Sequence, residues 1–185
     1  MKNRIPLFTC LLFLASYQQI SAQEYVSPTQ STETGKAPGM KVKLVHNAGG
    51  IQTYVVVFSK GDEIKSGLTE FAQKYSISAA HFTGLGDATS AKVGWYDSTR
   101  KAFKVISLPN PSEISSITGN ITMSEDKPGP HAHITLADEN GMVHGGHLLE
   151  LYVGPTVEIF VTVVPAIVSK QKDPGSGAAL IKFKD

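Results

Sequence analysis

Short runs of β-branched and aromatic residues, separated by brief turns, are the feature that most constrains how this sequence can fold. Residues 51–58 and 156–164 consist largely of Val, Ile, Thr, Phe and Tyr, which favour pleated, half-buried strands. Most links between such runs are short, and short links join antiparallel neighbours. Gly84 and Gly86 are expected to break the chain between two of the runs. The predicted strands are residues 41–45, 51–58, 76–82, 88–97, 101–107, 114–123, 131–149 and 156–164.

One segment, residues 62–75, has the spacing of an amphipathic helix. Ile64, Leu68 and Phe71 recur at intervals of three or four residues and form one apolar stripe. Asp62 is the expected N-cap, because a carboxylate there can accept hydrogen bonds from the free N–H groups of the first turn. The sequence therefore predicts an α+β fold, in which one main helix packs on a largely antiparallel β-sheet.

The first 22 residues have the three-part pattern of a secretory signal peptide. Lys2 and Arg4 precede an apolar run at 5–16, and small residues end at Ala22, where cleavage is expected. The apolar run is too short to span a bilayer about 30 Å thick, so no membrane span is expected after cleavage. The mature protein is therefore expected to be exported, either periplasmic or secreted. The alternatives are a membrane anchor or a mis-assigned start.

The rest of the chain is expected to form a leader and one domain. Residues 23–39 are rich in Ser, Thr, Pro and Gly without apolar periodicity, which is typical of a flexible leader. Residues 40–185 then make up a single domain. Cys10 is the only cysteine and lies inside the apolar run, so neither a lipid anchor nor a disulfide is expected in the mature protein.

The charge of the chain argues against a surface that binds nucleic acid. The sequence has 17 basic and 16 acidic residues, and loss of Lys2 and Arg4 leaves 15 against 16. Arg100 is then the only arginine, whereas surfaces that contact phosphates usually carry several.

The segment 131–147 carries the most informative motif, a His-x-His pair followed by a turn and Gly-Gly-His. Residues 138–141 suit a tight hairpin closed by a left-handed glycine, Gly141. That register places His133 directly opposite His147. His131 lies two residues from His133 and so points to the same face. The same parity places His144 on the opposite face.

Three imidazoles on one face of a hairpin suggest a metal site. His131, His133 and His147 could converge on one zinc ion at about 2.0–2.1 Å per bond. Three neutral ligands leave a fourth position open, as in catalytic zinc sites. The alternative is three ordinary histidines bonded to carbonyl groups or solvent. Single histidines such as His46 and His81 are expected to be structural.

These residues also carry a family resemblance. The sequence resembles the plants-and-prokaryotes conserved (PPC) domain over roughly residues 40–164. The resemblance implies an α+β domain that assembles as a homotrimer, with the matching histidines holding a metal near the subunit boundaries. The matching segments are His131 to Asp138, Gly141, Gly145 to Leu148, Phe82 to Gly86, Glu113 to Ile121 and Pro155 to Ile159.

The same resemblance extends to enzymes and to DNA-binding proteins. The fold is similar to that of acetolactate decarboxylase and a related zinc-dependent ester hydrolase, which bind zinc through three histidines. Plant members of the family bind DNA through an added Arg-Gly-Arg-Pro segment, which this sequence lacks. Pro111 and Ser112 also replace the arginine and phenylalanine that precede Glu113-Ile114 in the plant signature.

Three functions are therefore compared. The first is a zinc-dependent hydrolase or lyase acting on a small molecule, with Glu113 as the candidate catalytic base and Glu150 and Glu158 as weaker candidates. Glu113 could equally be an exposed carboxylate at a strand end. The second is a non-catalytic trimeric module that binds a ligand or a partner. The third is DNA binding. No nucleotide-binding or nucleophile motif is present.

Overall fold

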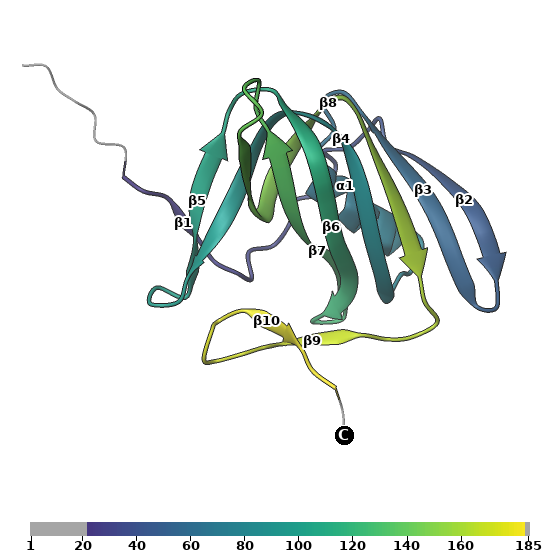
Figure 1. Ribbon diagram of the computed structural model, residues 1–185. Coiled ribbons are helices and arrows are strands. Elements are labelled where there is room, and N and C mark those ends of the chain that lie inside the picture. Colours follow the sequence, from purple (N-terminus) through teal and green to yellow (C-terminus); the bar gives the residue numbers. More distant parts are fainter. Residues whose placement is uncertain (1–21, 184–185) are drawn as a thin grey trace, which may run out of the picture.

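The structure, a computed structural model, describes residues 22–183 and contains a ten-stranded sheet with one helix in that part of the chain (Figure 1). The α+β fold expected from the sequence is confirmed. The predicted signal peptide, residues 1–22, lies almost entirely outside the described residues. No helix within residues 22–183 is long and apolar enough to cross a membrane. The elements are β1 (Tyr25–Val26), β2 (Lys41–Ala48), β3 (Ile51–Ser59), α1 (Ile64–Lys74), β4 (Ala79–Asp97), β5 (Ala102–Leu108), β6 (Ser112–Ser124), β7 (Lys127–Ala137), β8 (Val143–Val163), β9 (Ser169–Lys172) and β10 (Ala179–Ile181).

The sheet closes on itself because β4 pairs with β8 as well as with β5 and β6. Its main order is β1-β5-β4-β6-β7-β8-β3-β2, and all neighbours in this path are antiparallel. β4 also pairs with β8 from Ala80↔Val163 to Gly94↔His147. Strands β4, β6, β7 and β8 therefore close on one another and hold the β7–β8 hairpin in a fixed position.

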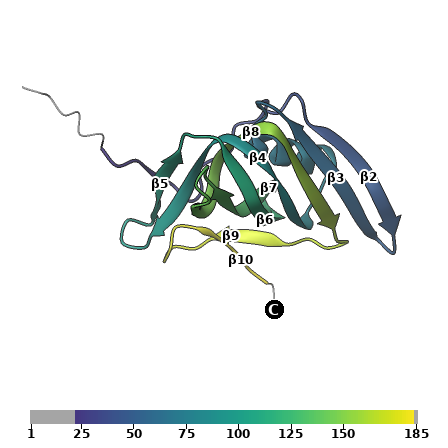
Figure 2. The ribbon, with the colours of Figure 1, turned by 45° about the horizontal axis from the view of Figure 1, so that its top comes forward.

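Helix α1 packs against β7 and β8 and fills the core behind the sheet (Figures 1 and 2). Ile64, Leu68 and Phe71 are fully buried, as their spacing predicts. They meet a strand layer that includes Val56 and Ile159, also fully buried. Burying each such side chain contributes about 1.5–3 kcal/mol.

The N-cap of α1 is Glu63, so the expectation of Asp62 is wrong by one residue. The Glu63 carboxylate accepts hydrogen bonds from the backbone N–H groups of Lys65 (3.1 Å) and Ser66 (2.6 Å). The Asp62 carboxylate instead accepts from the backbone N–H of Gly39, 2.9 Å away, and from that of Ser59. Asp62 thus fastens the segment before β2 to the helix entrance.

Gly84 and Gly86 do not end a strand, contrary to expectation. β4 runs continuously from Ala79 to Asp97, with a register shift against β6 between these glycines. Gly86 has φ 143°, and a Cβ there would lie 2.3 Å from the carbonyl oxygen of Thr156. The glycines therefore let β4 bend and approach the backbone of β8, and the chain continues past them.

Both ends of the described chain lie along the domain. Packed structure begins before residue 40, because β1 pairs with β5 and Ala37 is 5% exposed in the core. At the other end, β9 pairs in parallel with β6 through Met123↔Ser169 and Ser124↔Lys170. Figures 1 and 2 show β9 and β10 crossing below the lower end of β6. These two terminal segments frame the face that carries the histidines.

Candidate metal centre

The β7–β8 hairpin has the predicted register. The N–H of Asp138 donates to the carbonyl of Met142 (3.0 Å), and Gly141 has φ 74°. His133 pairs directly with His147 across the ladder. Because the turn fixes the register, residues many positions apart in the sequence meet on one face.

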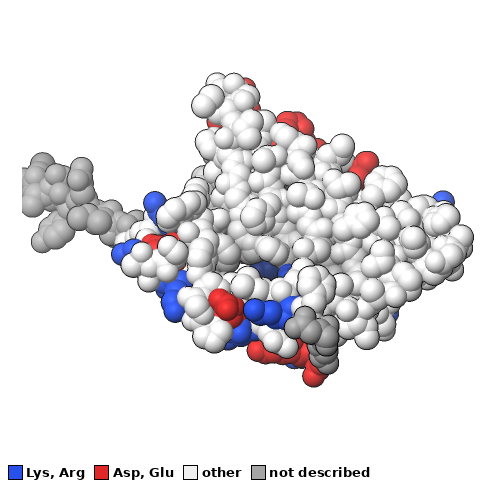
Figure 3. Space-filling view, turned by 60° about the horizontal axis from the view of Figure 1, so that its bottom comes forward, with Lys and Arg blue, Asp and Glu red and all other residues white. Residues whose placement is uncertain are grey.

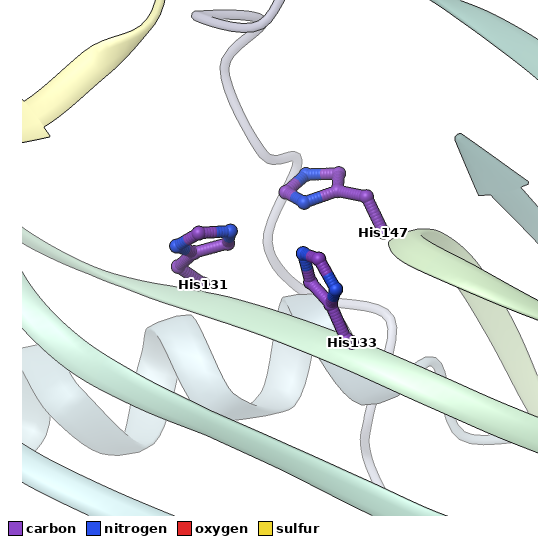
Figure 4. Close-up of side chains that lie close together, drawn as sticks. All are labelled: His131, His133 and His147. Carbon is purple, nitrogen blue, oxygen red and sulfur yellow. The ribbon is translucent and has the colours of Figure 1, made fainter. Parts of the chain in front are cut away.

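The three predicted histidines lie together (Figure 4). The candidate ligand nitrogens of His131, His133 and His147 are all within 4.8 Å of one another. The ring centroids are 5.4 Å apart for His131 and His133, 5.0 Å for His131 and His147, and 5.6 Å for His133 and His147. His144 is directed elsewhere, with its Nε2 3.4 Å from the Asp138 carboxylate.

Burial keeps two of the three imidazoles neutral. Burial, together with the smaller effects of the charges of Lys170, His133 and Lys65, lowers the pKa of His131 to about 4. Burial likewise lowers the pKa of His147 to about 3, helped by His131 and then by Lys65. A metal binds the neutral imidazole, so these two side chains do not have to lose a proton first at neutral pH.

An unpaired buried nitrogen indicates that the site fits a metal. The Nδ1 atom of His147 is buried and has no hydrogen-bond partner among the described residues. A buried polar atom without a partner costs about 1–3 kcal/mol. Tetrahedral zinc needs ligand atoms about 3.4 Å apart, from bonds of about 2.0–2.1 Å. The observed limit of 4.8 Å is within reach of small side-chain rotations.

His147 is held from one side by an aromatic ring that the sequence did not reveal. The Phe103 ring of β5 stacks on the His147 ring, with centroids 4.2 Å apart and planes 5° apart. Gly94 makes room for this stack, since a Cβ there would lie 2.9 Å from the Phe103 ring.

The Gly-Gly pair before His147 allows the close approach of two neighbouring strands. A Cβ on Gly145 would lie 2.5 Å from the carbonyl oxygen of Ile134 in β7. A Cβ on Gly146 would lie 2.9 Å from the carbonyl oxygen of Gly94 in β4. These glycines therefore let β7 and β4 both approach the strand that carries His147.

Glu113, the candidate catalytic base, lies away from the histidines within the chain. It pairs with Ala137, four residues along β7 from His133, which corresponds to about 13 Å. It faces Asp87 instead, and the hydrogen bond and charge of Asp87 raise the pKa of the Glu113 carboxyl above its usual range. Sequence reasoning could not see this distance because it depends on the pairing of β6 with β7.

The two weaker carboxylate candidates also differ in position. Glu150 lines the same cavity as His147, which has a volume of about 280 Å³, and its carboxylate is 3.5 Å from Lys92 Nζ. Glu158 is exposed on a central strand, between Val57 and Leu85, and forms no ion pair with residues 22–183. Glu150 is therefore the candidate nearest to the histidines.

Arg100, the other charged residue singled out in the sequence, lies away from the histidines. Its guanidinium is 2.9 Å from the Asp97 carboxylate and 4.9 Å from the centre of the Tyr25 ring. Both contacts are at the β4–β5 turn and its neighbour β1.

Two lysines that the sequence gave no reason to select also act on the cluster. Lys65 is in the first turn of α1 and lines the cavity with His147. Lys170 is in β9, and its Nζ is 3.3 Å from the Asn120 side-chain oxygen. Asn120 is the direct cross-strand partner of His131.

Comparison with known families gives one match. Residues 45–165 match the Plants and Prokaryotes Conserved (PCC) domain family. No curated protein matches the chain.

Solved structures with the same fold include a Ralstonia eutropha protein described as a "Putative DNA-binding protein". It is 36% identical, with 71% of this chain and 91% of that chain covered and a TM-score of 0.66. A Pyrococcus horikoshii plant- and prokaryote-conserved (PPC) protein is 28% identical, with 83% of this chain and 99% of that chain covered and a TM-score of 0.67. An Archaeoglobus fulgidus protein described as metal-containing is 28% identical, with 78% of this chain and 98% of that chain covered and a TM-score of 0.66.

The likeness to acetolactate decarboxylase is much more distant. A Staphylococcus aureus protein described as similar to that enzyme is 13% identical, with a TM-score of 0.47. A likeness at this level carries no argument about the chemistry of the histidines.

Proposed function

Since this chain belongs to the Plants and Prokaryotes Conserved domain family, we propose that it is an exported metal-binding protein in which His131, His133 and His147 hold one zinc ion. The convergence of three imidazoles within 4.8 Å is the observation that carries the proposal. The unpaired Nδ1 of His147 and the description of the Archaeoglobus fulgidus relative as metal-containing support it. Export is supported by the pattern of the first 22 residues.

The ligand set leaves room for a small molecule. When bound by three neutral imidazoles, zinc supplies a Lewis acid with one position open to water or ligand. His131 and His147 bind from a half-buried position, while His133 is exposed. Phe103 fixes the plane of the His147 ring by stacking on it. Gly145 and Gly146 allow the strands to bring His147 opposite His133.

A hydrolase or lyase would need a proton acceptor near this open position. Glu150 is better placed than Glu113 for that role, because it lines the cavity that His147 also lines. One oxygen of its carboxylate lies 3.5 Å from Lys92 Nζ, a contact that holds the side chain toward Lys92. The distance of Glu113 and the pairing of Glu150 both favour the second candidate, a module that binds a small ligand without turning it over.

Trimeric assembly is part of the proposal. The outer face of the sheet exposes two large apolar side chains, Leu85 (59%) and Phe160 (53%). Soluble monomers rarely expose clusters of such side chains, and a larger exposed patch indicates an interface. They are close on this face, since Leu85 pairs with Glu158, two residues from Phe160. Native mass spectrometry is expected to give three chains per particle.

DNA binding is the competing proposal that the description of the Ralstonia eutropha relative suggests. The near-neutral charge of the sequence and its two arginines argue against it. Retention of the mature chain on duplex DNA that falls steeply with salt would favour it.

Metal analysis tests the proposed function. The mature protein, purified without affinity metals and dialysed against zinc, is expected to hold about one zinc ion per chain. His133→Ala is expected to lose it, since it removes an exposed ligand with little effect on packing. His144→Ala is the matched control, because His144 lies on the same hairpin but outside the cluster. Equal zinc in all three proteins would show that the site is assigned wrongly.

A further inference from the structure

We propose that the open metal position takes a small oxyanion, a carboxylate or a phosphate, and that Lys65 and Lys170 hold it from two sides. This inference rests on the proposed zinc site and adds the chemical class of its ligand. It is carried by the placement of two half-buried lysines, of which Lys65 lines a cavity with His147 and Lys170 contacts Asn120, the cross-strand partner of His131.

Lys65 reaches the site from the helix. It lies in the first turn of α1 and lines the 280 Å³ cavity together with His147. No carboxylate oxygen of residues 22–183 lies within 4.0 Å of its Nζ. Its nearest acid along the chain, Glu63, is occupied by the backbone N–H groups of Lys65, Ser66 and Leu151.

The helix does not stabilise the positive charge of Lys65. The N-terminal end of a helix carries a partial positive charge, which disfavours an ammonium group there. Burial lowers the pKa of the Lys65 ammonium, more than the Glu63 charge raises it. A lysine in such a position is better stabilised by an anion from outside the chain.

Lys170 reaches the site from the C-terminal segment. Its Nζ is 3.3 Å from the side-chain oxygen of Asn120, and Asn120 pairs directly with His131. It is half-buried, and within the described chain no carboxylate lies within 4.0 Å of it. Residue 170 lies beyond the family match at 45–165, so β9 brings a cation to the site from outside the shared domain.

The two lysines would oppose a bare metal ion. Two positive charges near three histidines repel a divalent cation. In a site that held only a metal, carboxylates at the positions of the two lysines would attract the ion more strongly. An oxyanion would remove this conflict, because its negative charge would offset the two ammonium groups and its oxygens could accept charge-assisted hydrogen bonds from them. Figure 3 shows basic side chains inside a hollow of the lower face of the molecule.

The cavity next to the cluster limits the size of a ligand that binds between His147 and Lys65, the two residues of the proposed site that line it. A volume of about 280 Å³ is at the small end of ligand pockets, which span roughly 300–1,000 Å³. Phe103, Val105 and Leu149 give it an apolar wall, and residues of the segment before Gly39 close another side. The space beside His147 therefore suits a small molecule.

Cobalt(II) provides a direct test, since its visible absorption changes when an anion enters its coordination sphere. The mature full-length protein is loaded with cobalt(II), and acetate and inorganic phosphate are titrated in separate arms at constant ionic strength. A saturable spectral change is expected with one or both anions, and the arm that saturates at lower concentration identifies the ligand chemistry.

The lysine variants assign the binding groups. Lys65→Met and Lys170→Met are each expected to weaken anion binding about tenfold or more, as for loss of one charge-assisted hydrogen bond. Their cobalt affinity should be unchanged or higher, because a repelling charge is removed. Lys74→Met is the matched control, since Lys74 is exposed at the far end of the same helix.

The outcomes separate the two proposals. Failure of the wild-type protein to bind cobalt would overturn both the metal site and this inference. Cobalt binding with a spectrum that neither anion changes would leave the metal site standing and overturn the oxyanion. A response that is the same in Lys65→Met, Lys170→Met and wild type would show that the lysines do not hold the anion.

Discussion

Replacement of His147 by phenylalanine should raise the stability of the metal-free protein while abolishing metal binding. The buried Nδ1 of His147 has no hydrogen-bond partner within residues 22–183, and such an atom costs about 1–3 kcal/mol. A phenyl ring removes this cost and can keep the stack on Phe103, which is now 4.2 Å between centroids. With a chelator present, His147→Phe should therefore unfold with a free energy about 1–3 kcal/mol higher than wild type.

Added zinc should reverse this order. A ligand at 1,000 times its dissociation constant stabilises the folded state by about 4.1 kcal/mol, which exceeds the advantage of about 1–3 kcal/mol of the variant. Wild type gains this stability and the variant, which lacks one of three ligands, does not. The crossing of the two stabilities is the signature of a residue kept for a metal at the expense of the apo fold.

Urea unfolding at pH 7, at one protein concentration, with either chelator or zinc, measures both effects. His144→Phe is the control, since His144 is exposed and its substitution should change stability by less than about 0.5 kcal/mol. If His147→Phe is less stable than wild type in chelator, or gains as much from zinc, the reasoning about Nδ1 is refuted.

Three further predictions concern the pH dependence and the packing of the fold. In chelator, the free energy of unfolding should fall as the pH drops from about 6.5 toward 4. The reason is that His131 and His147, with folded pKa values of about 4 and 3, take up protons in that window only when the protein is unfolded. Urea titrations at pH 7 and 5 should show a smaller fall for His147→Phe than for wild type, and an equal fall would contradict the assignment. Glu63→Gln should lower stability by about 1–3 kcal/mol in thermal or urea unfolding, because a carboxylate that accepts three backbone N–H groups is replaced by an amide, whereas exposed Glu139→Gln should have little effect. Gly67→Ala should lower stability by about 1–3 kcal/mol despite the better helix propensity of alanine, since its Cβ would lie 2.4 Å from Phe58 Cε1 and 2.8 Å from Ala37 Cβ. Gly129→Ala is the control, because a Cβ there meets nothing within 4 Å. If the Gly67→Ala protein is as stable as Gly129→Ala, the packing around Gly67 is looser than the structure shows.

The sequence by itself determined the features that depend on a few neighbouring residues. The stripe of Ile64, Leu68 and Phe71 was enough to predict α1, because the helical period alone places them on one side. The turn at 138–141 was enough to predict the meeting of His133 and His147, because a tight turn fixes the register of both strands.

The choice between adjacent acids at the helix start needed the tertiary structure. Asp62 and Glu63 are both able to cap, and local spacing does not separate them. Contact of the Asp62 carboxylate with the N–H of Gly39, from a distant segment, leaves the cap to Glu63. The expectation that Gly84 and Gly86 break the strand was wrong for the same reason, since their role depends on the close approach of β8.

Only the closed sheet decided what surrounds the histidines. Phe103, Lys65 and Lys170 come from β5, α1 and β9, and nothing in their own sequence neighbourhoods points to the site. Glu113, chosen from its sequence context, was carried about 13 Å from His133 by the β6–β7 register. Local spacing fixes side chains within one turn or one hairpin, whereas contacts between distant segments follow from how the strands pair and close, which no local pattern specifies.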